Sequence, residues 1–143
     1  YLTALRKIYE IMSDKGVCIL HTIGSILPPQ PNAPFIQRYI FPDGEIPHES
    51  DMAKNIEKSG LIMSDRETLI RHYDKTLEAW LNRFLKNKHI VKDLFDQKFV
   101  KMWEFYLASC SAAFKYRDLV VFQYQLVKNF DAIPSNRRDY IYS

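Results

Sequence analysis

Val17-Cys18-Ile19-Leu20-His21-Thr22-Ile23-Gly24-Ser25 is the stretch of sequence that decides the fold. A short apolar run between two glycines is typical of a buried strand in an α/β sheet, and we expect that strand near residues 17–23. His21 would then lie at the far end of the strand, where ligands of open α/β sheets bind. A core histidine that only hydrogen-bonds its neighbours is the alternative, and for a lone histidine it is the commoner case.

Composition indicates one globular domain, or a piece of one. The chain has 143 residues, 47% of them hydrophobic, which is enough to bury a core. Cys18 and Cys110 stand in apolar surroundings, so we expect buried thiols and a reducing compartment rather than disulfides. The net charge of +3 permits an anionic membrane surface as a partner. No apolar run has the length of a membrane-spanning helix, and no signal-peptide pattern is present.

Several function classes are disfavoured by what the sequence lacks. The four glycines are far apart, so a glycine-rich nucleotide loop is not in this chain. Cysteine and histidine spacings typical of metal sites are missing, as is a nucleophile elbow. Basic and aromatic residues do not alternate as in single-strand nucleic-acid binders. Because a helical pattern also begins at the first residues, we expect the second half of a larger domain, with no metal and no nucleic-acid partner.

Hydrophobic periodicity predicts alternating helices and strands. A first helix would end at Lys15-Gly16, and a proline-rich loop would follow Ser25. Glu49 or Ser50 would cap a short helix that ends at Gly60, and Asp65 would cap a long one. The remaining expected elements are strands near 61–63 and 119–127, helices near 66–87 and 95–116, and a polar, solvated tail over 129–143.

The two long helices carry unusual residues on their apolar faces. Tyr73 lies on the first stripe, and Tyr106 and Cys110 lie on the second. Simple packing would fill such positions with leucine, and buried tyrosine hydroxyls need partners. A cavity that holds an ion or a ligand would supply such partners. The aromatic residues of Phe35–Phe41 could likewise pack over the sheet edge or line a pocket, and composition alone favours packing.

Four segments together resemble the cyclopropane-fatty-acyl-phospholipid synthase family, which includes the mycolic acid cyclopropane synthases. They match in the family's order from the first residue to about Lys128. The segments are His21-Thr22-Ile23-Gly24-Ser25, Phe35-Ile36-Gln37-Arg38-Tyr39-Ile40-Phe41-Pro42-Asp43-Gly44-Glu45-Ile46-Pro47, His72-Tyr73-Asp74-Lys75-Thr76-Leu77 with Trp80, and Met102-Trp103-Glu104-Phe105-Tyr106-Leu107-Ala108-Ser109-Cys110 through Phe114.

The resemblance implies an α/β fold: the C-terminal half of a Rossmann-like, S-adenosylmethionine-dependent methyltransferase, with a helical insertion that covers the acyl pocket. Residues 1–128 would form part of one methyltransferase domain and residues 129–143 the tail. The implied reaction transfers a methylene group to the cis double bond of an unsaturated phospholipid acyl chain. Relatives that make methyl-branched or hydroxylated chains leave the product open.

The resemblance also implies roles for individual residues. His21 and Tyr73 match side chains that bind a bicarbonate ion, which serves the family as a base, and Ile23 matches a ligand that binds through its backbone carbonyl. Positions matching the family's acyl pocket are Phe41, Ile46, Leu77, Tyr106, Cys110 and Phe114. Cys110 would then be part of the pocket wall and not a nucleophile.

The family pattern is incomplete here. The glycine loop for S-adenosylmethionine and a glutamate and cysteine of the ion site would lie upstream of Tyr1, so we expect this chain alone to be inactive. A catalytically silent lipid-binding module is the competing interpretation. The implied substrate places the enzyme in the cytoplasm, in peripheral contact with the inner face of the plasma membrane. Lys128, Arg137 and Arg138 could contact anionic head groups, although a solvated tail is the simpler expectation.

Overall fold

The chain is built around a three-stranded sheet. The computed structural model describes residues 1–134 and 137–141. The strands β1 (Val17–Ser25), β2 (Ile62–Leu69) and β3 (Leu119–Val127) are arranged in the order β1-β3-β2. Because β3 is antiparallel to both neighbours, β1 and β2 run parallel to each other at the two edges of this sheet.

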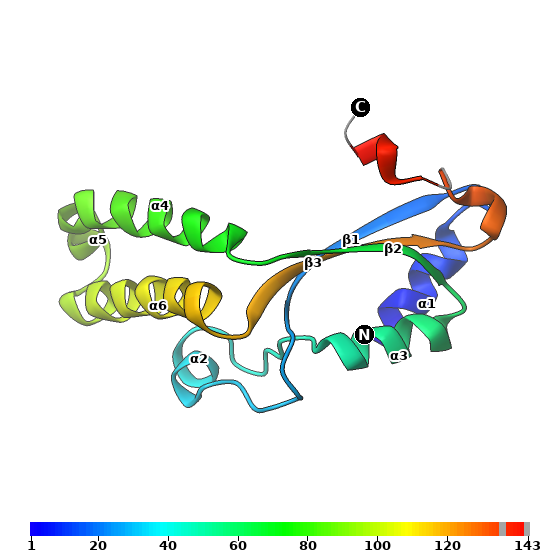
Figure 1. Cartoon of the computed structure of the whole chain (residues 1–143). Helices are drawn as coiled ribbons and strands as arrows, with labels where there is room; N and C mark the ends of the chain where they lie inside the picture. The colour runs from blue at the N-terminus through cyan, green and yellow to red at the C-terminus, as the bar shows by residue number, and fades with distance from the viewer. Residues whose placement is uncertain (135–136, 142–143) are drawn as a thin grey trace.

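Two helices cover one face of the sheet, α1 (Leu2–Ile11) and α3 (Glu49–Ser59), as Figure 1 shows. Their apolar faces meet the alternate residues of β3 that point the same way. The fully buried members of this core are Leu5, Met52, Ile56, Leu61, Val120, Phe122, Tyr124 and Leu126. Gly24 of β1 is required here, since a Cβ at that position would collide with the Phe122 ring.

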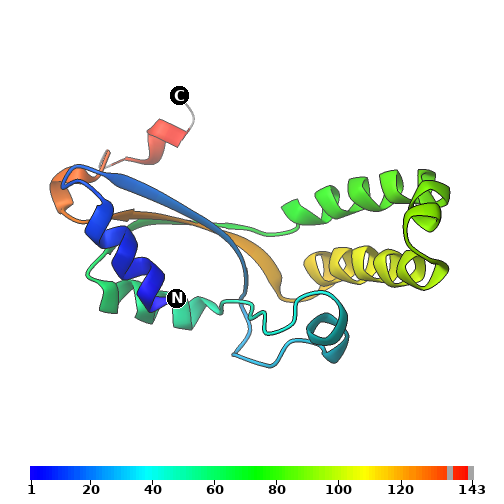
Figure 2. The same ribbon diagram turned by 180° about the vertical axis from the view of Figure 1, so that it is seen from behind.

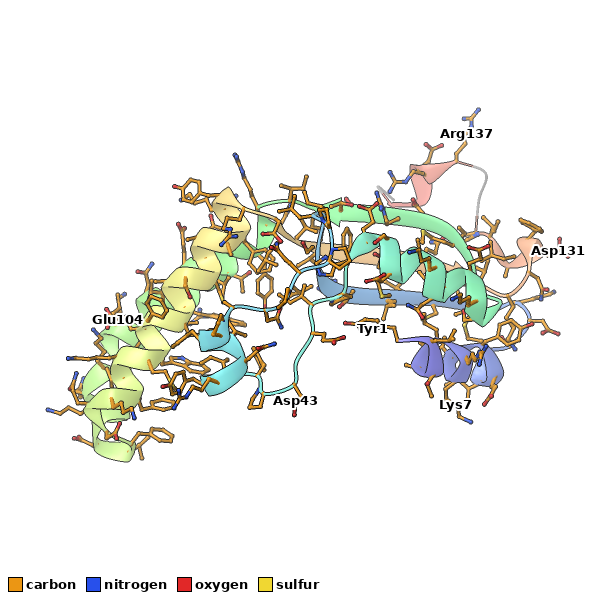
Figure 3. All side chains as sticks on the ribbon, turned by 90° about the horizontal axis from the view of Figure 1, so that it is seen from below. Tyr1, Lys7, Asp43, Glu104, Asp131 and Arg137 are labelled. Carbon is orange, nitrogen blue, oxygen red and sulfur yellow. The ribbon has the colours of Figure 1, made fainter. Side chains whose placement is uncertain are left out.

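The chain between β2 and β3 forms a helical hairpin. It projects from the end of the sheet that is opposite α1 (Figure 2). It consists of α4 (His72–Lys86), α5 (Lys88–Leu94) and α6 (Gln97–Tyr116). A second core joins it to the sheet through the buried residues Leu77, Leu107, Phe114 and Val121. The short helix α2 (Pro34–Tyr39) lies against α6, with the Phe35 and Phe105 rings 4.8 Å apart (Figure 3).

The strand β1 differs from its prediction in length and in burial. It extends to Ser25, so His21 lies in the middle of the strand and not at its end. Alternate residues of β1 are exposed, because α1 and α3 cover only one face of the sheet and no helix of the described residues covers the other face along most of this strand. The expectation of a fully buried strand was therefore wrong.

The segment before the hairpin also differs from its prediction. Asp65 does not cap a helix: it lies in β2, opposite Gln125 of β3, and β2 covers eight residues rather than three. The helix begins only at His72, after Arg71 in the left-handed region, and ends at Lys86, where α5 follows as a separate helix. Pairing with β3 outweighs the helical pattern, because an exposed edge strand tolerates polar residues.

Gly60 ends α3 as predicted, with φ of 84°, but the N-cap of that helix is His48 rather than Glu49 or Ser50. The tail is not simply solvated. The Asn129 amide donates to the Asp14 carbonyl at 3.2 Å, and the Arg138 guanidinium binds Asp65 at 2.8 Å. The 3₁₀ turns Phe130–Ala132 and Arg138–Ile141 complete the described chain. Within the described residues, no helix combines the length and the hydropathy that a membrane span requires.

Candidate active site

A pocket of about 740 Å³ lies between β1, the loop around Ile46, and the hairpin helices α4 and α6. Its wall includes all nine residues that the family resemblance implied for the site, namely His21, Ile23, Phe41, Ile46, Tyr73, Leu77, Tyr106, Cys110 and Phe114. The structure therefore brings together residues that are up to 93 positions apart in the chain, from His21 to Phe114.

Helical spacing explains how the hairpin contributes to the wall. Tyr106, Cys110 and Phe114 follow one another at intervals of four on α6 and so share one face. On α4, the Tyr73 ring lies 5.0 Å from the Phe114 ring and 5.9 Å from the Trp80 ring. The Phe41 ring meets Tyr106 edge-on at 6.2 Å. Most of the wall is consequently apolar and aromatic.

A buried polar contact fixes the two helices relative to each other. Ser111 on α6 donates its hydroxyl to the Asp74 carboxylate on α4 at 2.5 Å, and both side chains are buried. Lys115 Nζ lies 3.9 Å from the other Asp74 oxygen. Asp74 follows Tyr73 directly on α4, so this contact lies one residue from the pocket wall. The sequence analysis did not identify Asp74 or Ser111.

His21 has a cross-strand partner, Gln123 of β3. The two residues are opposite each other in the register, and Gln123 Nε2 lies 3.1 Å from His21 Nδ1. With the amide as donor, Nδ1 accepts, and the imidazole proton resides on Nε2. The contact therefore makes Nε2 the donor that His21 offers to a ligand.

The Ile23 carbonyl points away from β3. The Ser25 N–H donates to the Pro47 carbonyl at 3.0 Å, at the open edge of β1. Along a strand, alternate residues direct their N–H and C=O groups to the same side, so the Ile23 carbonyl also points to this edge. The Thr22 hydroxyl donates to the Ile23 carbonyl oxygen at 2.9 Å. The second lone pair of that carbonyl oxygen stays available to a ligand.

Burial favours the neutral forms of the Tyr106 hydroxyl and the Cys110 thiol, the two polar groups that α6 contributes to the pocket. It raises the pKa of Tyr106 to about 12, and it raises the pKa of the Cys110 thiol, which lies within hydrogen-bonding reach of Tyr106. Since the nucleophilic form of cysteine is the thiolate, Cys110 is poorly suited to attack a substrate. The chemistry of Cys110 thus agrees with a place in the pocket wall.

The proline-rich loop before α2 is held by His48, which the sequence analysis did not identify. The Gln30 N–H donates to His48 Nε2 at 3.4 Å, so the ring proton is on Nδ1, which donates to the Leu27 carbonyl at 3.0 Å. The Asn32 amide donates to the Gly44 carbonyl at 2.7 Å. These contacts place Asn32, Glu45 and Ile46 at the mouth of the pocket.

The sheet order and the helices around it are those of part of a Rossmann-like methyltransferase domain. The mycolic acid cyclopropane synthase CmaA1, solved in complex with SAH and CTAB, superposes with a TM-score of 0.80 at 24% identity. The superposition covers 88% of this chain and 49% of that structure. The α/β methyltransferase fold expected from the sequence is confirmed.

The chain belongs to the mycolic acid cyclopropane synthetase family, whose model matches residues 1–124. It is 35% identical over 123 residues to the cyclopropane-fatty-acyl-phospholipid synthase of Escherichia coli K12, covering 86% of this chain and 32% of that protein. It is 41% identical over 81 residues to a probable fatty acid methyltransferase of Pseudomonas putida, covering 57% of this chain and 21% of that protein.

The chain thus spans about a third of the length of the E. coli relative. Its family consists of S-adenosylmethionine-dependent methyltransferases that act on lipids, as the resemblance implied.

Proposed function

We propose that the whole protein is a cyclopropane-fatty-acyl-phospholipid synthase that transfers a methylene group from S-adenosylmethionine to the cis double bond of an unsaturated phospholipid acyl chain. One observation carries the proposal: a largely apolar pocket also contains His21, Tyr73 and the edge-directed Ile23 carbonyl. An apolar wall suits an acyl chain, and the polar groups suit proton transfer beside it.

S-adenosylmethionine, when bound by the whole protein, supplies an electrophilic methyl group. Methyl transfer to the double bond leaves a carbocation on the acyl chain, and ring closure requires loss of a proton from the new methyl group. The Tyr73, Tyr106 and Phe114 rings present π faces and edges in the pocket, and π faces stabilise a cation without bonding to it. In the whole protein, an apolar wall that closes over the acyl chain would also exclude water, which would otherwise trap the cation.

The proton acceptor that we propose is bicarbonate, and the residues present fit it. His21 Nε2 and the Tyr73 hydroxyl are donors suited to an anion, while the Ile23 carbonyl suits the hydroxyl group of that ion. In these roles His21, Ile23 and Tyr73 hold and orient the base, and none of them needs to react with the carbocation. We further propose that the remaining ligands and the cofactor-binding residues come from outside this chain, which by itself is inactive.

The substrate determines where the protein would work. We propose a cytoplasmic enzyme in peripheral contact with the inner face of the plasma membrane, where unsaturated phospholipid is available. One relative is a probable fatty acid methyltransferase. A second candidate product is therefore a methyl-branched acyl chain made in the same pocket.

The test is methyl transfer by the full-length protein to unsaturated phospholipid, with wild type compared with Tyr73→Phe. The variant keeps the ring contacts to Phe114 and Trp80 and loses only the hydroxyl. We expect kcat to fall on the order of a hundredfold, with little change in KM. Tyr116→Phe, at the exposed end of α6, is the matched control and should remain fully active.

The product and the rates discriminate among the alternatives. Cyclopropane ring protons in the NMR spectrum of the lipid support the synthase, and a saturated methyl branch supports the second product. Lipid binding with no methyl transfer by the full-length wild type would instead establish a silent lipid-binding module. A Tyr73→Phe variant as active as wild type would remove Tyr73 from the ion site.

A further inference from the structure

The outer end of the helical hairpin exposes apolar side chains to solvent. We define the hairpin tip as residues 85–101, which comprise the end of α4, all of α5 and the start of α6. At the tip, Leu94 is 72% exposed and Phe95 is 61% exposed, and Leu85 and Ile90 are also exposed. Figures 1 and 2 show this end of the hairpin projecting away from the sheet and from every other helix.

The same tip is positively charged. It has five lysines against two aspartates, a balance of +3, which equals the formal charge of all 143 residues. One aspartate, Asp96, is engaged in capping α6, where it accepts from the Phe99 N–H at 2.6 Å. Lys88 pairs with Glu104, whereas Lys92, Lys98 and Lys101 are exposed and form no ion pair within the described part of the chain. Exposed apolar groups among unpaired lysines are typical of surfaces that enter an anionic lipid interface.

A row of aromatic rings connects the tip with the pocket. Phe95 stacks on Phe99 at 4.3 Å, Phe99 on Trp103 at 5.9 Å, and Trp103 contacts Tyr106 at 5.1 Å. Phe95 is exposed at the tip, and Tyr106 lines the pocket. An acyl chain that follows this row meets apolar surface between the tip and the site of reaction.

We propose that the hairpin tip docks on the surface of an anionic phospholipid bilayer. Leu94 and Phe95 enter the interface, and Lys92, Lys98 and Lys101 bind head-group phosphates. The proposal rests on the proposed function for the source of the acyl chain. An acidic protein would also attract the lysines, but a bilayer accommodates the scattered apolar groups of a projecting tip and also supplies the occupant of the pocket at the end of the aromatic row.

The experiment is co-sedimentation of the full-length protein with vesicles of phosphatidylglycerol and phosphatidylcholine, and with vesicles of phosphatidylcholine alone. Lys92→Gln/Lys98→Gln/Lys101→Gln should weaken binding to the anionic vesicles by about fivefold per lysine, roughly a hundredfold in total. Leu94→Ser/Phe95→Ser should weaken it by about tenfold or more. Added salt should weaken wild-type binding and should affect the triple variant much less.

Matched controls come from the other end of the molecule. Lys7→Gln/Lys54→Gln/Lys58→Gln removes three exposed lysines from α1 and α3, and Ile11→Ser removes an apolar side chain that is 72% exposed. Both should bind anionic vesicles as wild type does. The proposal is overturned if the tip variants also bind like wild type, or if wild type binds both kinds of vesicle equally. It is likewise overturned if Leu94→Ser/Phe95→Ser leaves vesicle binding unchanged and alters only how the protein sediments without vesicles. That result would indicate that the tip binds another copy of the protein.

Methyl transfer to detergent-dispersed lipid separates this proposal from the proposed function. Tip variants that lose turnover on vesicles but keep it in detergent support docking. If no form of the protein shows turnover, the proposed function fails, while the vesicle comparison still reports on the tip.

Discussion

At the scale of the residue, Gln123 decides which imidazole nitrogen His21 offers to the pocket. Gln123→Leu removes the amide that lies 3.1 Å from Nδ1, so the imidazole proton is no longer confined to Nε2. One neutral hydrogen bond is worth about 1 kcal/mol, and we expect kcat to fall about fivefold. Nitrogen NMR shifts of His21 measure the tautomer directly and should change from Nε2–H towards a mixture of both tautomers.

A second variant of Gln123 distinguishes its hydrogen bond to the His21 imidazole from the packing of its side chain. Gln123→Glu keeps the length of the side chain but replaces the amide donor by an acceptor, so it should select the Nδ1–H tautomer and lower kcat further than leucine does. A glutamate variant with wild-type NMR shifts and wild-type turnover would show that Gln123 does not orient His21.

At the scale of the element, the contact between α4 and α6 supports the pocket. Ser111→Ala leaves the buried Asp74 carboxylate without its 2.5 Å donor. An unsatisfied buried acceptor costs about 1–3 kcal/mol, which corresponds to a fall in Tm of roughly 2–12 °C. Differential scanning calorimetry checks the value.

Ser109→Ala is the matched control for this prediction. Ser109 is on the same helix, but its hydroxyl donates only to the Tyr106 carbonyl one turn earlier. The control should stay within about 0.5 kcal/mol of wild type. An equal loss in both variants would attribute the effect to α6 itself and not to its contact with α4.

The elements that the sequence predicted well are those whose local pattern and tertiary surroundings agree. Residues 119–127 are rich in β-branched and aromatic side chains, and they form β3 with the predicted bounds. Asp65 was predicted to cap a helix over residues 66–87, yet residues 65–69 pair with β3. Pairing between segments distant in sequence cannot be inferred from periodicity.

The same distinction applies to the site. Spacing alone places Tyr106, Cys110 and Phe114 on one face of a helix. Their approach to His21 depends on the β1–β3 register and on the direction of the hairpin, so only the family resemblance could anticipate it. Gln123 and Asp74 were missed for this reason: each acts through a partner on another element.

At the scale of the whole molecule, the sheet is covered unevenly. α1 and α3 bury one face, whereas Val17, Ile19 and Ile23 of β1 expose apolar side chains on the other. Beside this stripe, the outer edge of β1 over residues 17–21 has no neighbouring strand among the described residues. An apolar strand with an open edge is a template for pairing with another chain.

A polypeptide of these 143 residues alone should therefore self-associate. Ile19 is 58% exposed in the middle of the stripe, and Ile19→Lys places a charge where a pairing strand would pack. Lysine on an edge strand opposes such pairing, so sedimentation velocity over a range of concentrations should show less association of the variant. Ile11→Lys adds the same charge on α1, away from the edge, and should associate as wild type does. If both variants associate equally, net charge alone or another surface controls the association, and the β1 edge is not its cause.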